Sequence, residues 1–177
     1  MLIYIHGFRS CAKGNKSKII KDYFGDLVAF NLPPSPLEAI EKLKPYAKPG
    51  NILIGSSLGG YYAIHLAEKY ALKAVLLNPS LKPYKTLKPY TGTQYRYCDN
   101  EPFKWKKRYL KELKSLKVKP KKGKYLVLLQ SKDEVLNYKK TLKVFKKLPN
   151  AKVIVEYGGN HRFENLQDYV CMIENFI

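Results

Sequence analysis

Six continuous apolar runs constrain the fold of this chain more than any other feature of its sequence. They occupy residues 2–5, 27–30, 52–54, 74–77, 125–129 and 153–155. Apolar side chains take successive positions in these runs instead of alternating with polar ones, which is typical of strands that are buried on both faces. The runs therefore predict a parallel sheet that is covered by helices on both sides.

Segments with helical spacing lie between these runs. The clearest begins with Ser35, Pro36 and Glu38, which match an N-cap serine, a first-turn proline and the glutamate of a capping box. Further helices are predicted over residues 15–24, 59–70, 137–148 and 164–176. Because strands and helices alternate, we expect an α/β fold with a mostly parallel, doubly wound sheet of about six strands. At 177 residues, the chain is expected to form one domain over residues 1–177.

The segment 79–124 interrupts this alternation. It is too long for a plain loop in a compact domain, so we expect it to carry structure or function of its own. Residues 104–119 have the spacing of an amphipathic helix, with Trp105, Tyr109, Leu113 and Leu116 along one side. Two interpretations follow. The helix either docks on the core as a surface helix or forms part of a lid over the active site.

The formal net charge of +19 at pH 7 raises the question of a nucleic-acid partner. Only four of the 33 basic residues are arginine, however, whereas base reading and bidentate phosphate contacts favour the arginine side chain. Lysines are also spread along almost every segment. We therefore expect most of this charge to be a solvated surface and not a nucleic-acid interface. A positive field would still raise the local concentration of small acidic substrates.

Three cysteines, Cys11, Cys98 and Cys171, occur at unrelated spacings without a Cys-x-x-Cys pair. This odd number predicts reduced thiols in a cytoplasmic protein and no zinc site. The apolar run at the N-terminus is too short for a signal peptide and lacks a basic region before it. No apolar stretch approaches the ~18 residues of a membrane-spanning helix. These observations together predict a cytoplasmic location.

The pentapeptide 55–59, Gly-Ser-Ser-Leu-Gly, lies between a predicted strand and a predicted helix. A G-x-S-x-G pattern in this context is typical of a nucleophile elbow, in which a strained turn projects the serine hydroxyl above the sheet. The glycines on either side avoid a clash where strand and helix converge. Ser57 is therefore the candidate nucleophile. Because the pattern also occurs by chance, the assignment depends on the partners of Ser57.

A serine hydroxyl needs a neighbouring base, and the chain has three histidines. His6 directly follows the first strand, and His65 lies within a predicted helix, where structural roles suffice. His161 ends a glycine-containing loop, residues 158–161, after the last predicted strand. Open α/β sheets bind their ligands at the carboxyl ends of the strands. We therefore predict that His161 is the base.

A carboxylate should orient the imidazole of His161. Asp133 lies just past the end of the strand predicted at 125–129, and the adjacent Glu134 is the alternative. With Asp133, the order along the chain is Ser57, Asp133, His161, which is the order of the α/β-hydrolases. We prefer Asp133 for its shorter side chain and for the family resemblance described below.

A tetrahedral intermediate also needs two hydrogen-bond donors for its oxyanion. The backbone N–H of Leu58, directly after the nucleophile, is one candidate, and the N–H of Phe8, in the loop after the first strand, is the other. Gly7 would let the chain turn so that this N–H points inward, and His6 is expected to brace the loop. Cys11 lies near the same loop, but the sequence supplies it with no base, so we do not expect a thiol nucleophile.

These motifs together resemble the YqiA-type esterases, a compact branch of the α/β-hydrolases. The resemblance spans nearly the whole chain and rests on five segments: His6-Gly7-Phe8 with Ser10, residues 55–63, Leu77-Asn78-Pro79, residues 133–136 and Gly159-Asn160-His161. It implies an α/β-hydrolase fold in which a small insert covers the site. It also implies hydrolysis of short acyl esters or thioesters without a cofactor.

The resemblance carries the triad roles to Ser57, Asp133 and His161, and the oxyanion hole to Phe8 and Leu58. The chain departs from the family's pattern at two places: Lys132 precedes Asp133, where the family tends to have glycine, and Arg162-Phe163 follows His161. Both differences bear on substrate preference.

The sequence therefore predicts a serine esterase or thioesterase that acts on a small acyl ester or acyl thioester. Substrate contacts are expected from Gly7, Trp105 and Tyr109, and neither a metal nor a cofactor is expected. The alternative is a catalytically idle hydrolase-fold module whose basic insert binds an anionic partner.

Overall fold

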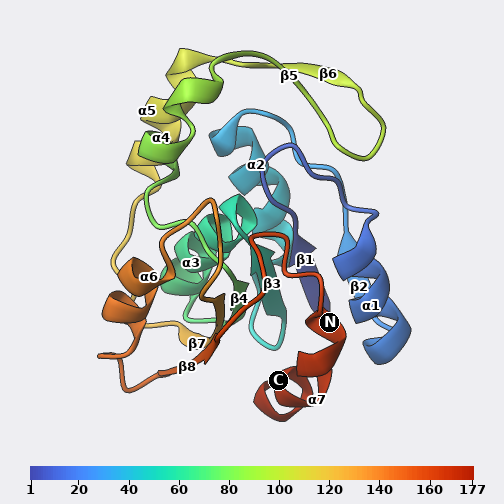
Figure 1. The fold of residues 1–177 in the computed structure, drawn as a ribbon, viewed down its shortest axis with the longest axis vertical. Coiled ribbons are helices and arrows are strands. Elements are labelled where there is room, and N and C mark those ends of the chain that lie inside the picture. Colours follow the sequence, from blue (N-terminus) through green and yellow to red (C-terminus); the bar gives the residue numbers. More distant parts are fainter.

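A six-stranded parallel sheet forms the centre of the computed structural model, which describes residues 1–177 (Figure 1). The strand order is β2-β1-β3-β4-β7-β8, and every neighbouring pair is parallel. The strands are β1 (Leu2–Ile5), β2 (Leu27–Ala29), β3 (Ile52–Ser56), β4 (Lys73–Leu77), β7 (Lys124–Gln130) and β8 (Ala151–Glu156). The predicted doubly wound sheet is confirmed, because all six strands coincide with the continuous apolar runs.

The strand order reverses between β1 and β3, where the chain passes from one half of the sheet to the other. Loops that follow neighbouring strands separate at such a point, so a ligand site opens beyond the carboxyl ends of the strands. The loops after β1, β3, β7 and β8 all begin at this edge. They carry every residue predicted for the catalytic centre.

Helices cover both faces of the sheet. On one face lie α2 (Pro36–Leu43), α3 (Leu58–Tyr70) and α6 (Tyr138–Phe145), and on the other lie α1 (Asn15–Phe24) and α7 (Val170–Phe176). The helix predicted over 164–176 is divided, because the short 3-10 helix η3 (Leu166–Tyr169) precedes α7. Another 3-10 helix, η1 (Lys44–Tyr46), follows α2. Helix α2 begins with the predicted N-cap, since Ser35 Oγ accepts a hydrogen bond from the N–H of Glu38 at 3.4 Å. The predicted capping box is not formed, because the Glu38 side chain makes no return hydrogen bond to Ser35. None of the helices combines the length and the apolar character that a membrane crossing needs.

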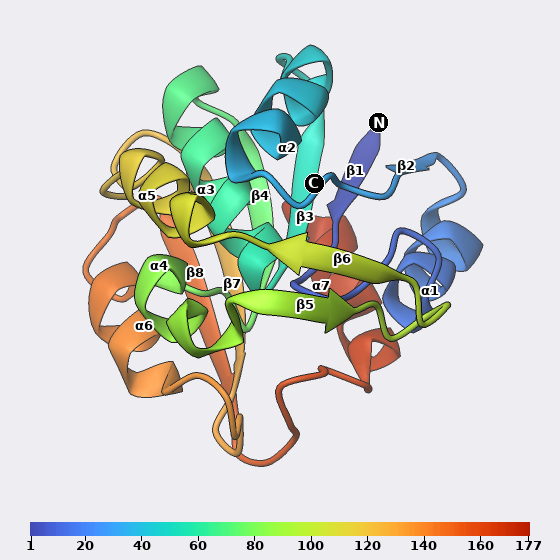
Figure 2. The ribbon, with the colours of Figure 1, turned by 90° about the horizontal axis from the view of Figure 1, so that it is seen from above.

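The segment between β4 and β7 forms a cover over the carboxyl edge of the sheet (Figures 1 and 2). It contains α4 (Pro83–Thr86), the 3-10 helix η2 (Lys88–Tyr90), the antiparallel hairpin of β5 (Gly92–Tyr95) and β6 (Pro102–Trp105), and α5 (Lys107–Ser115). The prediction of one helix over 104–119 is wrong at its start, because Trp105 ends a strand. Burial alternates from the half-buried Phe103 through the exposed Lys104 to the buried Trp105, which is the period of a strand with one covered face.

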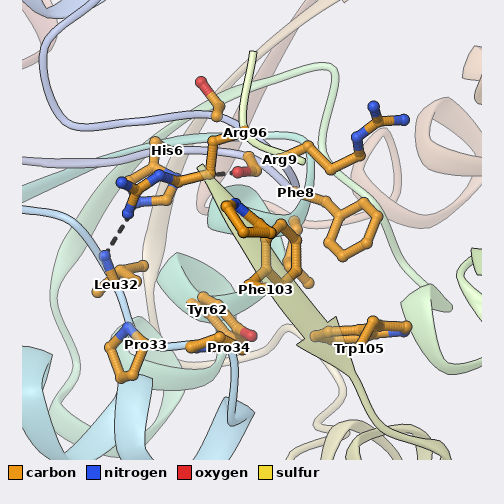
Figure 3. Close-up of a pocket in the computed structure, with 14 residues that line it drawn as sticks. His6, Phe8, Arg9, Leu32, Pro33, Pro34, Tyr62, Arg96, Phe103 and Trp105 are labelled. Carbon is orange, nitrogen blue, oxygen red and sulfur yellow. Dashed lines mark hydrogen bonds between the residues drawn. The ribbon is translucent and has the colours of Figure 1, made fainter. Parts of the chain in front are cut away.

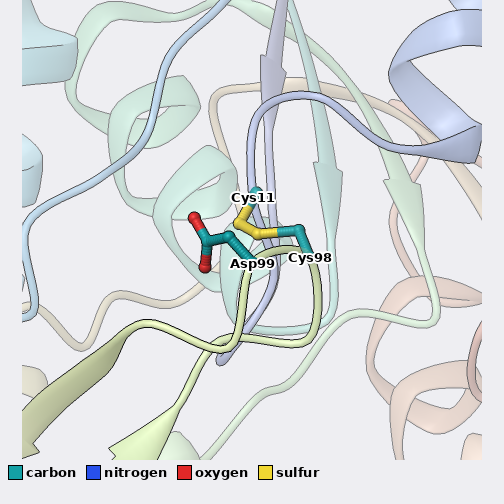
Figure 4. Close-up of side chains that lie close together, drawn as sticks. All are labelled: Cys11, Cys98 and Asp99. Carbon is teal, nitrogen blue, oxygen red and sulfur yellow. A yellow bond between two sulfur atoms is a disulfide. The ribbon is translucent and has the colours of Figure 1, made fainter.

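A disulfide joins Cys11, in the loop after β1, to Cys98, in the turn of the β5–β6 hairpin (Figure 4). Their Cα atoms are 6.3 Å apart, although 87 positions separate them in the sequence. The expectation of reduced thiols is therefore wrong for these two cysteines, because only the fold brings the two loops together. Cys171 is free and exposed. The disulfide anchors the cover to the loop that contains Phe8.

Replacing Cys98 with serine is expected to lower the free energy of unfolding by about 2–5 kcal/mol, because the cross-link restricts the unfolded chain. Urea denaturation of the wild type and the variant measures this difference, and Cys171→Ser is the matched control because that thiol has no disulfide partner. Equal stability of the wild type and Cys98→Ser, with and without reductant, would mean that Cys11 and Cys98 are not bonded in solution.

Candidate active site

Ser57 lies on a strained turn between β3 and α3. Its backbone dihedrals are φ 53° and ψ −115°, in a region that residues other than glycine rarely adopt. Strand and helix approach so closely here that a Cβ atom at Gly55 would lie 2.7 Å from Gly60 Cα, and one at Gly59 would overlap the Ile5 carbonyl group. The two glycines of the motif therefore permit the turn that presents the serine side chain.

The side chains of Ser57, His161 and Asp133 form a continuous hydrogen-bonded chain. His161 Nε2 is 3.0 Å from Ser57 Oγ, and His161 Nδ1 is 2.8 Å from Asp133 Oδ2. Since a carboxylate only accepts hydrogen bonds, the proton of the neutral ring lies on Nδ1, and Nε2 is free to accept the proton of Ser57. The Asp133 side chain is 2% exposed and that of His161 is 18% exposed, so the imidazole is reachable from solvent while the carboxylate is shielded.

Asp133 is fixed on its other side by the chain that follows it. Asp133 Oδ1 accepts hydrogen bonds from the N–H groups of Val135 at 2.8 Å and Leu136 at 2.7 Å. The neighbouring Glu134 contacts the backbone of His161 instead of its ring, because Glu134 Oε2 accepts a hydrogen bond from the N–H of His161 at 2.9 Å. This bond holds the pKa of the Glu134 carboxyl below its ordinary value. Asp133 therefore contacts the imidazole ring, and Glu134 contacts the backbone of the same residue.

A buried amide holds the loop that carries His161, and sequence reasoning missed it. Gln130, at the end of β7, has no exposed surface, and its Oε1 accepts the N–H of Asn160 at 2.8 Å. Its Nε2 donates to Glu156 Oε2 at 2.7 Å and to Asn165 Oδ1 at 2.6 Å. Asn78 donates from Nδ2 to the carbonyl of Asn160 at 3.1 Å. The backbone N–H and the carbonyl oxygen of Asn160, the residue before His161, are therefore both held by hydrogen bonds with buried side chains.

Glu156 completes this buried support. Burial alone would raise the pKa of its carboxyl, but the hydrogen bonds from Tyr169, Asn165 and Gln130 outweigh burial and lower the pKa. Tyr169 donates its hydroxyl to Glu156 Oε2 at 2.8 Å. In the sequence, the only signals for this support were two polar residues at strand ends, Gln130 and Glu156.

His6 braces the loop after β1, as the sequence predicted. Its Nδ1 is 2.9 Å from the carbonyl oxygen of Gly7, and its Nε2 accepts the N–H of Leu32 at 3.1 Å. Burial lowers the pKa of His6, and the charges of Arg96 and Lys42 lower it further, against the hydrogen bond to Gly7. The ring is therefore a neutral structural element. The other remaining histidine, His65, contacts the carbonyl of Leu116 through Nδ1 at 2.8 Å, and burial lowers its pKa.

The two N–H groups predicted for the oxyanion hole belong to Leu58, which directly follows Ser57, and to Phe8, which lies in the loop after β1. Leu58 is the first residue of α3, so its N–H has no acceptor within the helix. The N–H of Phe8, outside any helix or strand, donates to no group of the protein. Gly7 brings its loop close to Ser57, since a Cβ atom at Gly7 would lie 3.3 Å from Ser57 Cβ.

Two clefts meet at Ser57 and His161. One cleft lies beside the segment between β4 and β7 and is called the insert-side cleft; its volume is about 450 Å³. Its charged groups are Arg9 and Glu134. Its other lining residues include Phe8, Leu58, Ser80, Pro83, Leu87, Tyr90, Val135 and Leu136. The α1-side cleft has a volume of about 620 Å³ and is lined in addition by Gly7, Phe8, Ser10, Asn15, Lys16, Tyr97, Arg162 and Glu164. An ester bond at Ser57 would therefore have room on both sides.

Trp105 and Tyr109, the predicted substrate contacts of the insert, lie outside both clefts. Trp105 lines a separate cavity of about 90 Å³ behind the loop after β1, together with Phe8 and Phe103 (Figure 3). Its ring centroid is 4.9 Å from that of Phe8 and 5.3 Å from that of Tyr109. Both side chains are buried. They pack behind the residue that carries one predicted oxyanion donor.

The fold is that of the α/β-hydrolases, as comparison with solved structures shows. Alpha/beta hydrolase domain-containing protein 10 from mouse matches 98% of this chain and 88% of its own, with a TM-score of 0.76 and 18% identity. The monoacylglycerol lipase of Paleococcus ferrophilus matches 99% and 93%, with a TM-score of 0.73 and 17% identity. Est1E from Butyrivibrio proteoclasticus matches 97% and 84%, with a TM-score of 0.73 and 16% identity.

Within this fold, the chain belongs to the uncharacterised protein family UPF0227, whose model matches residues 1–177. The UPF0227 protein PM0825 of Pasteurella multocida is 27% identical over 187 aligned positions that cover 99% of this chain and 98% of the relative. The UPF0227 protein YcfP of Salmonella paratyphi A is 25% identical with the same coverage. The family resemblance inferred from the motifs is thereby confirmed.

Proposed function

We propose that this protein is a serine hydrolase that cleaves acyl esters or thioesters through an acyl-enzyme. The observation that carries the proposal is the hydrogen-bonded chain from Ser57 through His161 to Asp133, with Ser57 on a strained turn between two clefts. A serine becomes nucleophilic when a positioned base takes its proton, and the base needs a carboxylate to fix its tautomer. These three side chains supply the required set of groups.

The reaction would proceed in two halves. Ser57 Oγ attacks the carbonyl carbon while His161 Nε2 takes the hydroxyl proton, and Asp133 stabilises the imidazolium. The N–H groups of Phe8 and Leu58 hold the oxyanion. His161 then donates its proton to the departing alcohol or thiol, which leaves an acyl group on Ser57. Water, deprotonated by His161, hydrolyses this acyl-enzyme to the carboxylic acid and restores the serine.

The insert-side cleft is the proposed site of the acyl half of the substrate. Its walls beside Ser57 include Pro83, Leu87, Val135 and Leu136, which offer apolar surface at about 0.8 kcal/mol for each buried methylene. The names of several structural neighbours, an esterase and a monoacylglycerol lipase among them, support an ester as the substrate class. No step of this mechanism calls for a metal or a cofactor.

The cytoplasmic location predicted from the sequence stays a prediction. The disulfide between Cys11 and Cys98 is a type of bond that is more common in oxidising compartments than in the cytosol.

A panel of substrates tests the proposal against the alternative of an idle binding module. Acetyl, butyryl and octanoyl esters of one alcohol, and the matching thioesters, are incubated with the folded protein and product release is followed. We expect turnover of at least the short-chain members. A folded protein that turns over none of them, at any concentration at which they dissolve, would favour the binding module.

The value of kcat/KM is expected to rise with pH through a single ionisation, because His161 accepts the Ser57 proton only as a neutral imidazole. Burial lowers the pKa of His6 and His65, so both stay neutral to lower pH than an ordinary histidine. A lowered histidine pKa stabilises the fold at neutral pH, and this contribution is lost as the pH falls through the lowered value.

The measurement is kcat/KM from about pH 5 to pH 8. Samples held at each pH and assayed at the upper limit separate a loss of fold from titration of the base. A profile that does not change across this range would contradict the role of a histidine base.

A further inference from the structure

Two cations that form no salt bridge, Lys16 and Arg162, line the α1-side cleft. Lys16 lies in the first turn of α1, and Arg162 directly follows His161. Both line the cleft of about 620 Å³ that also contains Ser57 and His161. The two cations thus come from opposite ends of the chain and meet beside the proposed nucleophile and base.

No carboxylate lies within 4.0 Å of either cation, since neither forms a salt bridge. The one acidic residue of the cleft, Glu164, accepts a hydrogen bond from Asn160 Nδ2 at 2.8 Å. Burial lowers the pKa of the half-buried Lys16; the charge of Glu164 opposes this effect, and the charge of Arg162 adds to it. A partly desolvated ammonium beside a second cation is stabilised by any anion that enters the cleft.

The insert-side cleft differs in its charge. Its one cation, Arg9, donates from Nε to the carbonyl of Tyr95 at 2.9 Å and lies over the ring of Tyr97 at 4.5 Å. Glu134 lines the same cleft and offsets that charge. Of the two halves of an ester bound at Ser57, only the half in the α1-side cleft would therefore encounter an excess of positive charge.

We propose that the α1-side cleft binds the leaving-group half of the substrate and selects an alcohol or thiol that carries an anionic group, phosphate or carboxylate. This inference rests on the proposed hydrolase function and adds a substrate class to it. Lys16 supplies a compact charge, and Arg162 supplies a planar set of donors that matches both kinds of oxyanion. After acyl transfer, the anionic alcohol or thiol departs through this cleft while the acyl group stays on Ser57.

The first experiment compares two butyryl esters that differ only in the alcohol, glycerol or glycerol phosphate. Their kcat/KM values are measured for the wild type, Lys16→Gln, Arg162→Gln and the double variant. Lys152→Gln, an exposed lysine of β8 that lines neither cleft, is the matched control for the loss of one positive charge. The readout is the ratio of the two kcat/KM values within each protein, so a general effect on turnover cancels.

We expect the wild type and Lys152→Gln to prefer the phosphorylated ester equally. Each substitution in the cleft should lower the ratio by roughly tenfold, the effect of one charge-assisted hydrogen bond at a partly exposed site. The same ratio in the wild type and the double variant would overturn the proposal, because the two cations would then be an ordinary solvated surface.

A binding measurement keeps this proposal separable from the proposed function. Glycerol phosphate, lactate and glycerol are titrated into the protein, and the backbone amide signals of residues 16 and 162 are followed by NMR. We expect saturable shifts with the two anions, stronger with phosphate, none with glycerol, and none in the double variant. Anion binding without ester turnover would contradict the proposed hydrolase function but support the anion subsite. Turnover of both esters without anion binding would contradict only the proposed subsite.

Discussion

Replacing Ser57 with alanine is expected to lower kcat for ester hydrolysis by a factor on the order of 10⁶, because nucleophile, base and carboxylate act as a unit. The fold should persist, since alanine keeps the Cβ atom and loses only the hydroxyl that contacts His161 Nε2. Steady-state kinetics with a butyryl ester gives the loss of activity, and circular dichroism with urea denaturation is the control for folding. Retention of more than a few per cent of the activity would mean that another nucleophile is at work.

Replacing Asp133 with asparagine is expected to lower kcat by about 10⁴. An amide N–H₂ directed at His161 Nδ1 favours the wrong ring tautomer, in which Nε2 carries the proton and cannot accept that of Ser57. The pH optimum and kcat of this variant are compared with those of the wild type.

The adjacent Glu134→Gln variant is the matched control for the loss of a negative charge. Its amide oxygen still accepts the backbone N–H of His161, so we expect less than about a tenfold loss, within the range for one charge-assisted hydrogen bond. If Glu134→Gln lost more activity than Asp133→Asn, the assignment of the orienting carboxylate would be wrong.

Most of the sheet could be predicted from the sequence, because burial on both faces makes each strand a continuous apolar run. The positions of Ser57 and His161 followed from the same reasoning, since a turn after β3 and a loop after β8 must lie at the same edge of a parallel sheet. The choice between Asp133 and Glu134 depends on the structure. Both follow β7, and only the direction of each side chain distinguishes the contact with the ring from the contact with the backbone.

The features that the sequence did not reveal depend on contacts between distant segments. The disulfide joins positions that are 87 residues apart, and nothing local to Cys11 or Cys98 indicates the pairing. Trp105 and Tyr109 are four positions apart, which fits a helix, yet Trp105 belongs to a two-stranded hairpin. The support of the His161 loop by Gln130 depends on the neighbouring strand β8, which aligns Gln130 with Glu156.

Labelling with a fluorophosphonate tests the central claim most directly, because the reagent phosphonylates an activated serine and releases fluoride, whatever the natural substrate. The folded wild type is treated with the probe, digested and mapped by mass spectrometry, with Ser57→Ala as the matched control. The account predicts a single stoichiometric adduct on Ser57, no adduct on the Ser57→Ala variant and slower labelling of Asp133→Asn. A folded protein that is not labelled, or whose label maps to another residue, would contradict the assignment of Ser57 as an activated nucleophile.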